Sequence, residues 1–106
     1  MAYNTKKFHQ ALKWFKKSAY QGFSGAQHTL GTMYHLAQYI TKNKAIAFEW
    51  FEKAAKQGHA KAQYNLGLLY LNGHGVTQDY NTAKKWFNES AKQGHSIARL
   101  ILRDFI

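Results

Sequence analysis

The 106-residue sequence contains no cysteine and no proline, and only five of its residues are acidic. Without cysteine, the chain has no disulfide, no zinc-thiolate centre and no thiol nucleophile. Because proline interrupts helices, its absence suits a chain that is helical almost throughout. No apolar run approaches the roughly 20 residues that span a bilayer, and the start MAYNTKKFHQ lacks the apolar stretch of a signal peptide. As given, the sequence predicts a soluble, cytoplasmic chain, unless a leader has been trimmed from it.

The shortage of acidic residues leaves the chain strongly basic, with a formal net charge of +10. No acidic residue precedes Glu49, so the first 48 residues carry +7 and the remainder carries only +3. This asymmetry favours an acidic partner or surface, including nucleic acid, and it also keeps a small protein soluble with no partner at all.

One nine-residue phrase occurs three times in the chain. It reads WFKKSAYQG from Trp14, WFEKAAKQG from Trp50 and WFNESAKQG from Trp86, so the interval is 36 residues both times. Self-similarity at such a period is typical of helical repeat proteins, in which neighbouring units bury a shared core. The period predicts one repeat domain at residues 5–106 after a tail at residues 1–4. Its units are expected at about residues 5–40, 41–76 and 77–106.

Each unit is expected to form two amphipathic helices. In the middle unit, Ala47, Trp50 and Phe51 begin an apolar stripe at helical spacing, and a second stripe follows Gly58. The tryptophan and phenylalanine pairs recur with the period beside alanine, which favours core packing between units over a base-stacking platform. The sequence therefore predicts six helices, near residues 6–20, 24–37, 42–56, 60–71, 78–92 and 96–105.

Cap signals mark several helix boundaries. The glycine that ends each phrase supplies the left-handed residue with which many helices end. Thr41 and Thr77 are expected to be N-caps, and Asp79 is expected to add a favourable charge to the first turn. Tyr39 stands in the connection between the first two units, where it is either an exposed contact residue or a cover for its own loop.

The middle unit, AFEWFEKAAKQGHAKAQYNLGLLYLNGHGVTQDYNTA, resembles the Sel-one-like repeat family, a branch of the tetratricopeptide-like helical repeats. The resemblance covers about residues 5 to 106, although the first unit lacks the loop glycines and the third ends in LRDFI. It implies an all-α fold, a right-handed α-solenoid of three helix-turn-helix repeats with about six helices. It also implies a concave face that binds other proteins, as in adaptors of bacterial or endoplasmic-reticulum assemblies.

Two glycines lie inside predicted second helices, where each costs about 1 kcal/mol relative to alanine. Gly31 and Gly67 are therefore expected to admit a bulky ring from the aromatic pair of the next unit. The third unit has Arg103 at this position. Its end is apolar, which suggests self-association as a hypothesis; the apolar residues are Ile101, Phe105 and Ile106.

The inventory of reactive groups is poor. Five carboxylates without cysteine give no convergent catalytic set, so no enzyme activity is predicted. His59 and His95 are one repeat apart, and stacked units would separate them by roughly 10 Å, too far for one zinc ion. They are expected to start helices instead. His28 and His35 have no evident third ligand, and His74 lies in a loop, so neither a metal nor any other cofactor is predicted.

Lysines on the exposed sides of the first helices are the candidate binding residues. If these helices line the concave face, as in related repeats, the groove is basic. The leading hypothesis is a non-catalytic module that binds an acidic segment of another protein there. The alternative is a weak nucleic-acid or polyanion binder that uses the same lysines. The predicted residues are Lys13, Lys16, Lys17, Lys53, Lys84 and Lys85.

Overall fold

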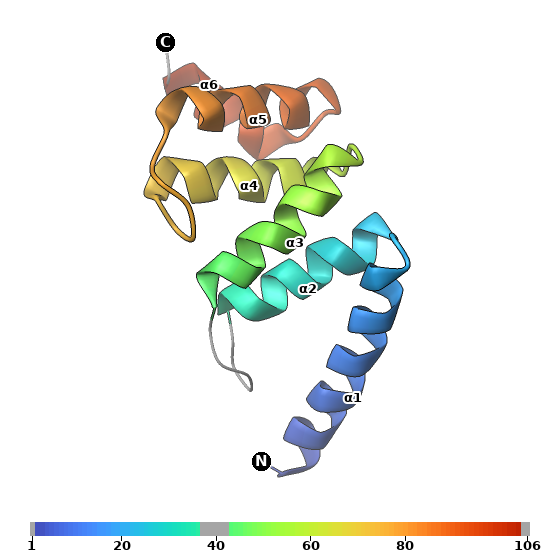
Figure 1. The fold of residues 1–106 in the computed structure, drawn as a ribbon. Coiled ribbons are helices and arrows are strands. Elements are labelled where there is room, and N and C mark those ends of the chain that lie inside the picture. Colours follow the sequence, from blue (N-terminus) through green and yellow to red (C-terminus); the bar gives the residue numbers. More distant parts are fainter. Residues whose placement is uncertain (1, 37–42, 105–106) are drawn as a thin grey trace.

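The computed structural model describes residues 2–36 and 43–104, with side chains from residue 6 onward. Six helices make up this part of the chain (Figure 1). Each coincides with a predicted helix to within two residues at both ends, except that the first begins inside the segment 1–4 that was expected to be a tail. The helices are α1 (Ala2–Tyr20), α2 (Ser24–Leu36), α3 (Lys44–Lys56), α4 (Ala60–Asn72), α5 (Tyr80–Lys92) and α6 (Ser96–Asp104).

The helices stack in sequence order into an elongated solenoid. The substantial contacts all join consecutive helices. α2 packs more extensively on α3 than on α1, and α4 packs more extensively on α5 than on α3. The molecule measures 48 × 23 × 21 Å, with α1 at one end of the stack and α5 and α6 at the other (Figure 1). Within the described residues, no helix combines the length and the apolar character needed to cross a membrane.

The glycines of the three phrases close the first helices, as predicted. Gly22, Gly58 and Gly94 have φ values of 97°, 90° and 93°. After α3, the N–H of Gly58 donates to the carbonyl of Ala55 at 2.9 Å. The N–H of His59 donates to the carbonyl of Ala54 at 3.2 Å. Two carbonyls at the end of the helix are therefore satisfied.

The N-caps differ from the predicted ones. Asp79 caps α5, with a carboxylate oxygen 3.1 Å from the N–H of Thr82, and this bond lowers the pKa of Asp79. The prediction that Thr77 caps this helix is wrong, because Thr77 lies too far ahead of the first turn to reach its amides. Asn43 caps α3 in the same way, at 2.9 Å, in place of the predicted Thr41. Thr41 and Tyr39 themselves lie outside the described residues.

The two helical glycines admit aromatic rings, as predicted. A Cβ placed on Gly31 would lie 2.9 Å from the ring of Phe51, and one on Gly67 would lie 2.7 Å from the ring of Phe87. Phe51 is only 2% exposed and Phe87 is fully buried. Each ring therefore fills the space left by a missing side chain on the preceding unit, and this contact sets how closely consecutive units approach.

The tryptophans of the phrases have different environments. Trp50 is 7% exposed, and its ring meets the edge of Tyr20 at a centroid distance of 5.1 Å. Trp14 is 71% exposed, so the prediction that it is a core residue is wrong. The reason is its place in the stack: the side chains that cover Trp50 come from the unit before it, whereas Trp14 belongs to the first helix described.

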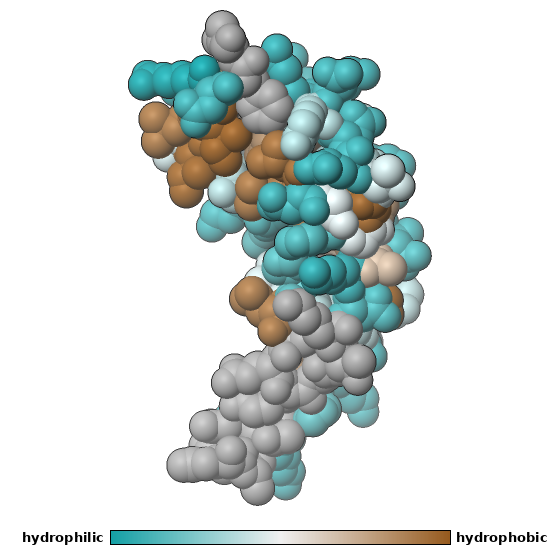
Figure 2. Space-filling model, turned by 90° about the vertical axis from the view of Figure 1, so that its left-hand side faces the viewer, coloured by the Kyte–Doolittle hydropathy of each residue, from teal (hydrophilic) through white to brown (hydrophobic). Residues whose placement is uncertain are grey.

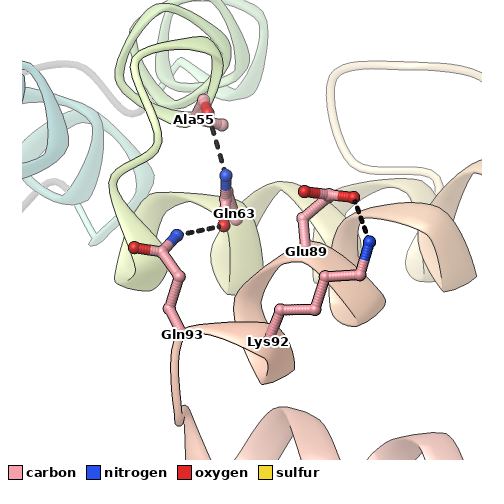
Figure 3. A network of polar contacts seen from close by, with 5 residues as sticks. All are labelled: Ala55, Gln63, Glu89, Lys92 and Gln93. Carbon is pink, nitrogen blue, oxygen red and sulfur yellow. Dashed lines mark hydrogen bonds and ion pairs between the residues drawn. The ribbon is translucent and has the colours of Figure 1, made fainter.

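Glutamines form a polar ladder across the unit boundaries (Figure 3). The buried Gln63 donates from Nε2 to the carbonyl of Ala55 at 3.2 Å, and its Oε1 accepts from Nε2 of Gln93 at 2.8 Å. One unit earlier, Nε2 of Gln57 donates to Oε1 of Gln27 in the same way, at 2.7 Å. The glutamine of the QG pair therefore ties each unit to the second helix of the preceding one, a role that the sequence alone did not reveal.

Apolar side chains gather at the end of the stack where α4, α5 and α6 lie (Figure 2). Ile97 and Leu100 are 50% and 55% exposed, and Ile101 is half-buried against the core beside α5. The other residues assigned to this end, Phe105 and Ile106, lie outside the described part of the chain. Self-association through this end stays a prediction.

Candidate functional site

Two of the six predicted lysines share a groove between the first helices of adjacent units. Lys16 on α1 and Lys53 on α3 are exposed at its sides. The space between them is about 280 Å³, and we refer to it as the α1–α3 groove. It is lined by Lys16, Tyr20, Leu30, Tyr34, Ile46, Glu49, Trp50 and Lys53.

The α1–α3 groove has an apolar floor and charged sides. Trp50 is held against Tyr20, and Leu30 is fully buried beneath them. Glu49 adds one carboxylate to the lining. The pairs Lys56–Glu52, at 3.8 Å, and Lys92–Glu89, at 3.2 Å, are formed within single helices and do not involve the groove lysines (Figure 3 shows the second). Such surface pairs add little to stability.

Lys13 and Lys17 lie on another surface of α1, around the exposed Trp14. Nζ of Lys17 is 5.7 Å from the centroid of the Trp14 ring, within the range of a cation–π interaction. Consecutive helix positions are about 100° apart, so Lys16 and Lys17 point in different directions. We call this surface the Trp14 face; it consists of Lys7, Gln10, Ala11, Lys13, Trp14 and Lys17.

The remaining predicted lysines, Lys84 and Lys85, are exposed on α5 and line neither the α1–α3 groove nor the Trp14 face. Lys17 and Lys53 hold the same position in consecutive units, and Lys13 and Lys85 hold the same position two units apart. That the six lysines form one binding face stays a prediction.

A second cleft lies between α2 and α4 and was not anticipated from the sequence. Its volume is about 350 Å³, and Nδ2 of Asn65 lies 2.8 Å from Nε2 of His28 across it. The available signal was the spacing of His28, Thr32 and His35 at intervals of four and three residues, which places them on one helix face. The cleft is lined by His28, Thr32, His35, Leu36, Phe51, Asn65, Leu68, Leu69, Asn72 and His74.

The pKa of His28 is lowered to about 4, first by burial and then by the nearby charges of His59 and Lys61. His28 is therefore neutral at pH 7 and contributes a hydrogen bond to the cleft rather than a charge. Its ring stacks on that of His59 at a centroid distance of 4.9 Å.

His59 and His95 start helices, as predicted. Nδ1 of His59 accepts from the N–H of Ala62 at 3.2 Å, and Nδ1 of His95 accepts from the N–H of Ala98 at the same distance. In residues 2–36 and 43–104, no three histidine, cysteine or carboxylate side chains are grouped so that they could hold a metal ion.

Comparison with known families accounts for this arrangement of helices. The Sel1 repeat model matches residues 5–23, 24–59 and 60–95. The chain belongs to the Sel1 repeat family. The two complete matches, 24–59 and 60–95, begin at α2 and α4. Each therefore joins the second helix of one unit to the first helix of the next, and these are the helix pairs that pack most extensively.

Solved structures give the same result. A protective antigen present in uropathogenic Escherichia coli strains, which displays an SLR fold, is 40% identical and superposes with a TM-score of 0.82; the match covers 84% of this chain but only 19% of the antigen. A Sel1 repeat protein from Oxalobacter formigenes is 38% identical, with a TM-score of 0.85, and the match covers 87% of this chain and 69% of that protein. Cysteine rich protein B of Helicobacter pylori, at 23% identity, shares the fold with a TM-score of 0.82, and the match covers 86% of this chain and 68% of that protein. Comparison with curated proteins yields no significant match.

Sel1 repeat proteins generally are scaffolds for protein–protein interaction rather than enzymes. This family property agrees with the surface described above, which offers grooves and exposed lysines.

Proposed function

We propose that this Sel1 repeat chain is a non-catalytic interaction module that binds an acidic segment of another protein in the α1–α3 groove. The observation that carries the proposal is the placement of Lys16 and Lys53 on either side of an apolar floor built around Trp50. A partner segment with carboxylates beside apolar side chains matches both features of the groove.

In this proposal, some lysines contact the bound segment and others attract it from a distance. Lys16 and Lys53 line the groove, so the proposal assigns the contacts to them. Lys13, Lys17, Lys84 and Lys85 lie elsewhere, so they contribute to the basic field that draws an acidic partner toward the molecule. Such long-range attraction raises the association rate and weakens with salt, whereas contacts on the floor persist.

Weak binding of nucleic acid by the same lysines is the competing hypothesis. Within the groove, Trp50 is buried and cannot offer its face to a base, which leaves Tyr20 as the strongly exposed ring among the lining residues. A single strand stacks successive bases on several exposed rings, so this lining favours a protein segment.

Fluorescence anisotropy at about 50 and 150 mM salt tests the proposal. The probes are a labelled 15-residue peptide of alternating Glu and apolar residues, a single-stranded DNA, a duplex DNA and an RNA of similar charge. The groove variant is Lys16→Glu with Lys53→Glu, and the matched control, with the same change in net charge, is Lys84→Glu with Lys85→Glu.

We expect peptide binding to persist near 150 mM salt and to weaken by about tenfold in the groove variant, equivalent to about 1.4 kcal/mol. The control variant should lose less than about threefold, because its lysines act only at long range. Equal losses in the two variants would show that charge alone is being measured. Submicromolar affinity for a nucleic acid near 150 mM salt would favour the competing hypothesis.

A further inference from the structure

The cleft between α2 and α4 lies within the stack rather than at one of its ends (Figure 1). α2 packs on α1 and α3, and α4 packs on α3 and α5, so both helices have their neighbours along the solenoid. A further unit at either end of the stack would therefore leave this cleft open. Its volume of about 350 Å³ is in the range of ligand-binding clefts.

Stacking of the units does not require the polar lining of this cleft. Four of its polar residues are replaced by apolar ones exactly one repeat later, at the boundary between the second and third units. The pairs are His28 and Tyr64, Thr32 and Leu68, His35 and Leu71, and Asn65 and Ile101. Tyr64 and Ile101 pack on the core of the third unit, so the second boundary closes without these polar groups. Polar groups are costly to desolvate, which makes their concentration at the first boundary informative.

Two asparagines of the cleft have hydrogen-bonding groups available to a ligand. Nδ2 of Asn65 lies 2.8 Å from Nε2 of His28, and an amide nitrogen can only donate, so the histidine accepts. Oδ1 of Asn65 and its second N–H remain available. Asn72 is exposed, and no residue in the described part of the chain pairs with its amide. Each carboxamide can therefore donate and accept at the same time.

The cleft offers no counter-charge to an ionic ligand. No lysine, arginine, aspartate or glutamate is among its lining residues, although the chain contains 15 lysines and arginines. His28 is neutral at pH 7, because burial and nearby charges lower its pKa to about 4. The rest of the lining is partly aliphatic and includes the half-buried Leu68. These features fit an uncharged ligand that combines hydrogen-bonding groups with an apolar one.

The main chain of a peptide has the pairing groups that a carboxamide matches, one N–H donor and one C=O acceptor per residue. Asn65 and Asn72 are seven residues apart on α4, which corresponds to about 10.5 Å along the helix axis. About three residues of extended chain cover this distance. Leu68 lies between the asparagines on the same helix face, where it can contact one apolar side chain of the segment.

We propose that the cleft between α2 and α4 binds an extended, uncharged peptide segment of a partner protein, with Asn65 and Asn72 paired to its main-chain amides. The inference rests on the proposed function only in that the chain is a protein-binding module. The cleft shares no lining residue with the α1–α3 groove, and its ligand differs in charge from the acidic segment proposed there.

The test is an NMR titration of the ¹⁵N-labelled protein that follows the side-chain amide signals of Asn65 and Asn72. The probe is an acetylated and amidated nine-residue peptide of alternating serine and leucine, which carries no charge and places its leucines on one side when extended. The control probe has the same sequence with N-methyl groups on its three central amides, which removes those N–H donors.

Two variants of the cleft use residues that the repeat itself supplies. Asn72→Leu introduces the residue that the first unit has at this position, and His28→Tyr with Asn65→Ile transfers the apolar pair of the second boundary. Asn88→Leu, at an exposed position of α5 outside the cleft, is the matched control. Circular dichroism verifies that each variant is folded.

We expect the probe to shift both side-chain amide signals, and its affinity to fall about tenfold or more in either cleft variant. Asn88→Leu should lose less than about twofold, and the N-methylated probe should bind the wild type about tenfold more weakly. Raising the salt from about 50 to 150 mM should change the affinity by less than about twofold, because the probe is uncharged.

Failure of this inference is distinguishable from failure of the groove proposal, since the two probes differ in charge and report on different residues. Binding of the uncharged probe without binding of the acidic peptide would refute the groove proposal alone, and the reverse result would refute this inference alone.

Four results would overturn the inference. One is the absence of shifts at the Asn65 and Asn72 amides at about 1 mM probe, a concentration at which even weak complexes form. Another is equal affinity for the two probes, which would show that the main chain is not recognised. The third is unchanged affinity in Asn72→Leu. The fourth is tighter binding of a single-stranded RNA that Asn72→Leu weakens, which would assign the cleft to nucleic acid.

Discussion

The ring of Phe87 lies over the α-carbon of Gly67, so close that a Cβ on the glycine would be 2.7 Å from ring atom Cε1. The same relationship joins Gly31 to Phe51 one unit earlier. A glycine that is unfavourable for its own helix thus allows the next unit to approach. The spacing of the solenoid depends on this pair, because both rings are almost completely buried.

Replacing Gly67 with Ala should destabilise the protein by about 1 to 2 kcal/mol. Overpacking costs about 1 to 3 kcal/mol, and a Cβ only 2.7 Å from a buried ring belongs in the upper part of this range, about 2 to 3 kcal/mol. The better helix propensity of alanine returns about 1 kcal/mol. Urea unfolding followed by circular dichroism measures the change. Gly25→Ala is the control, because nothing lies within 4 Å of a Cβ at this helical position, and it should raise stability. A Gly67→Ala protein as stable as the wild type would contradict this account of unit spacing.

Replacing Gln63 with Ala should lower the free energy of unfolding by about 1 to 3 kcal/mol. The change removes two hydrogen bonds, each worth about 0.5 to 1.5 kcal/mol, although the carbonyl of Ala55 keeps the N–H of Gly58 and the amide of Gln93 keeps the carbonyl of Gly58. Gln21→Ala, at an exposed glutamine of the first phrase, should change stability by less than about 0.5 kcal/mol. Equal unfolding midpoints for the two variants would show that the ladder does not stabilise the stack.

Alanine at Trp50 and alanine at Trp14 should have very different effects, although the two residues hold the same position in the phrase. Trp50→Ala creates a cavity in the core and should cost about 3 to 5 kcal/mol. Trp14→Ala removes an exposed ring and should cost less than about 0.5 kcal/mol. Thermal unfolding of the two variants side by side distinguishes them, and a large loss in Trp14→Ala would mean that the Trp14 face is covered in solution.

The repeat period, the six helices and the glycine–phenylalanine contacts were predictable because each follows from spacing along the chain. The exposure of Trp14 was not, because it depends on which unit lies in front of the ring rather than on its own helix. The glutamine ladder was missed for a related reason: the partners of Gln63 are a carbonyl eight residues away and an amide from the following unit.

The binding residues were predictable only as exposed lysines. Helical spacing separates Lys16 from Lys17 by about 100°, and the packing of α1 on its neighbours decides which of them enters the α1–α3 groove. The cleft between α2 and α4 was missed because its two sides come from different units. The spacing of histidines on α2 indicates one side of it but not the other.

Stability should fall as the pH is lowered from about 6.5 toward 4. In the unfolded chain His28 has its ordinary pKa of 6.5, whereas in the folded protein burial lowers this value to about 4. The unfolded state therefore binds a proton first, and acid favours unfolding across this window. His28→Gln should flatten the pH dependence of urea unfolding in this range. An imidazole of His28 that titrates near 6.5 by NMR would refute the assignment.

The central claim is that an acidic protein segment binds in the α1–α3 groove, and NMR chemical-shift mapping tests it most directly. The ¹⁵N-labelled protein is titrated with the alternating acidic peptide at about 150 mM salt. We predict that the largest shifts will be at the amides of Lys16 and Lys53 and at the indole of Trp50, with small changes at Lys84 and Lys85. Shifts concentrated around His28 and Asn65, or spread evenly over all the lysines, would contradict the claim.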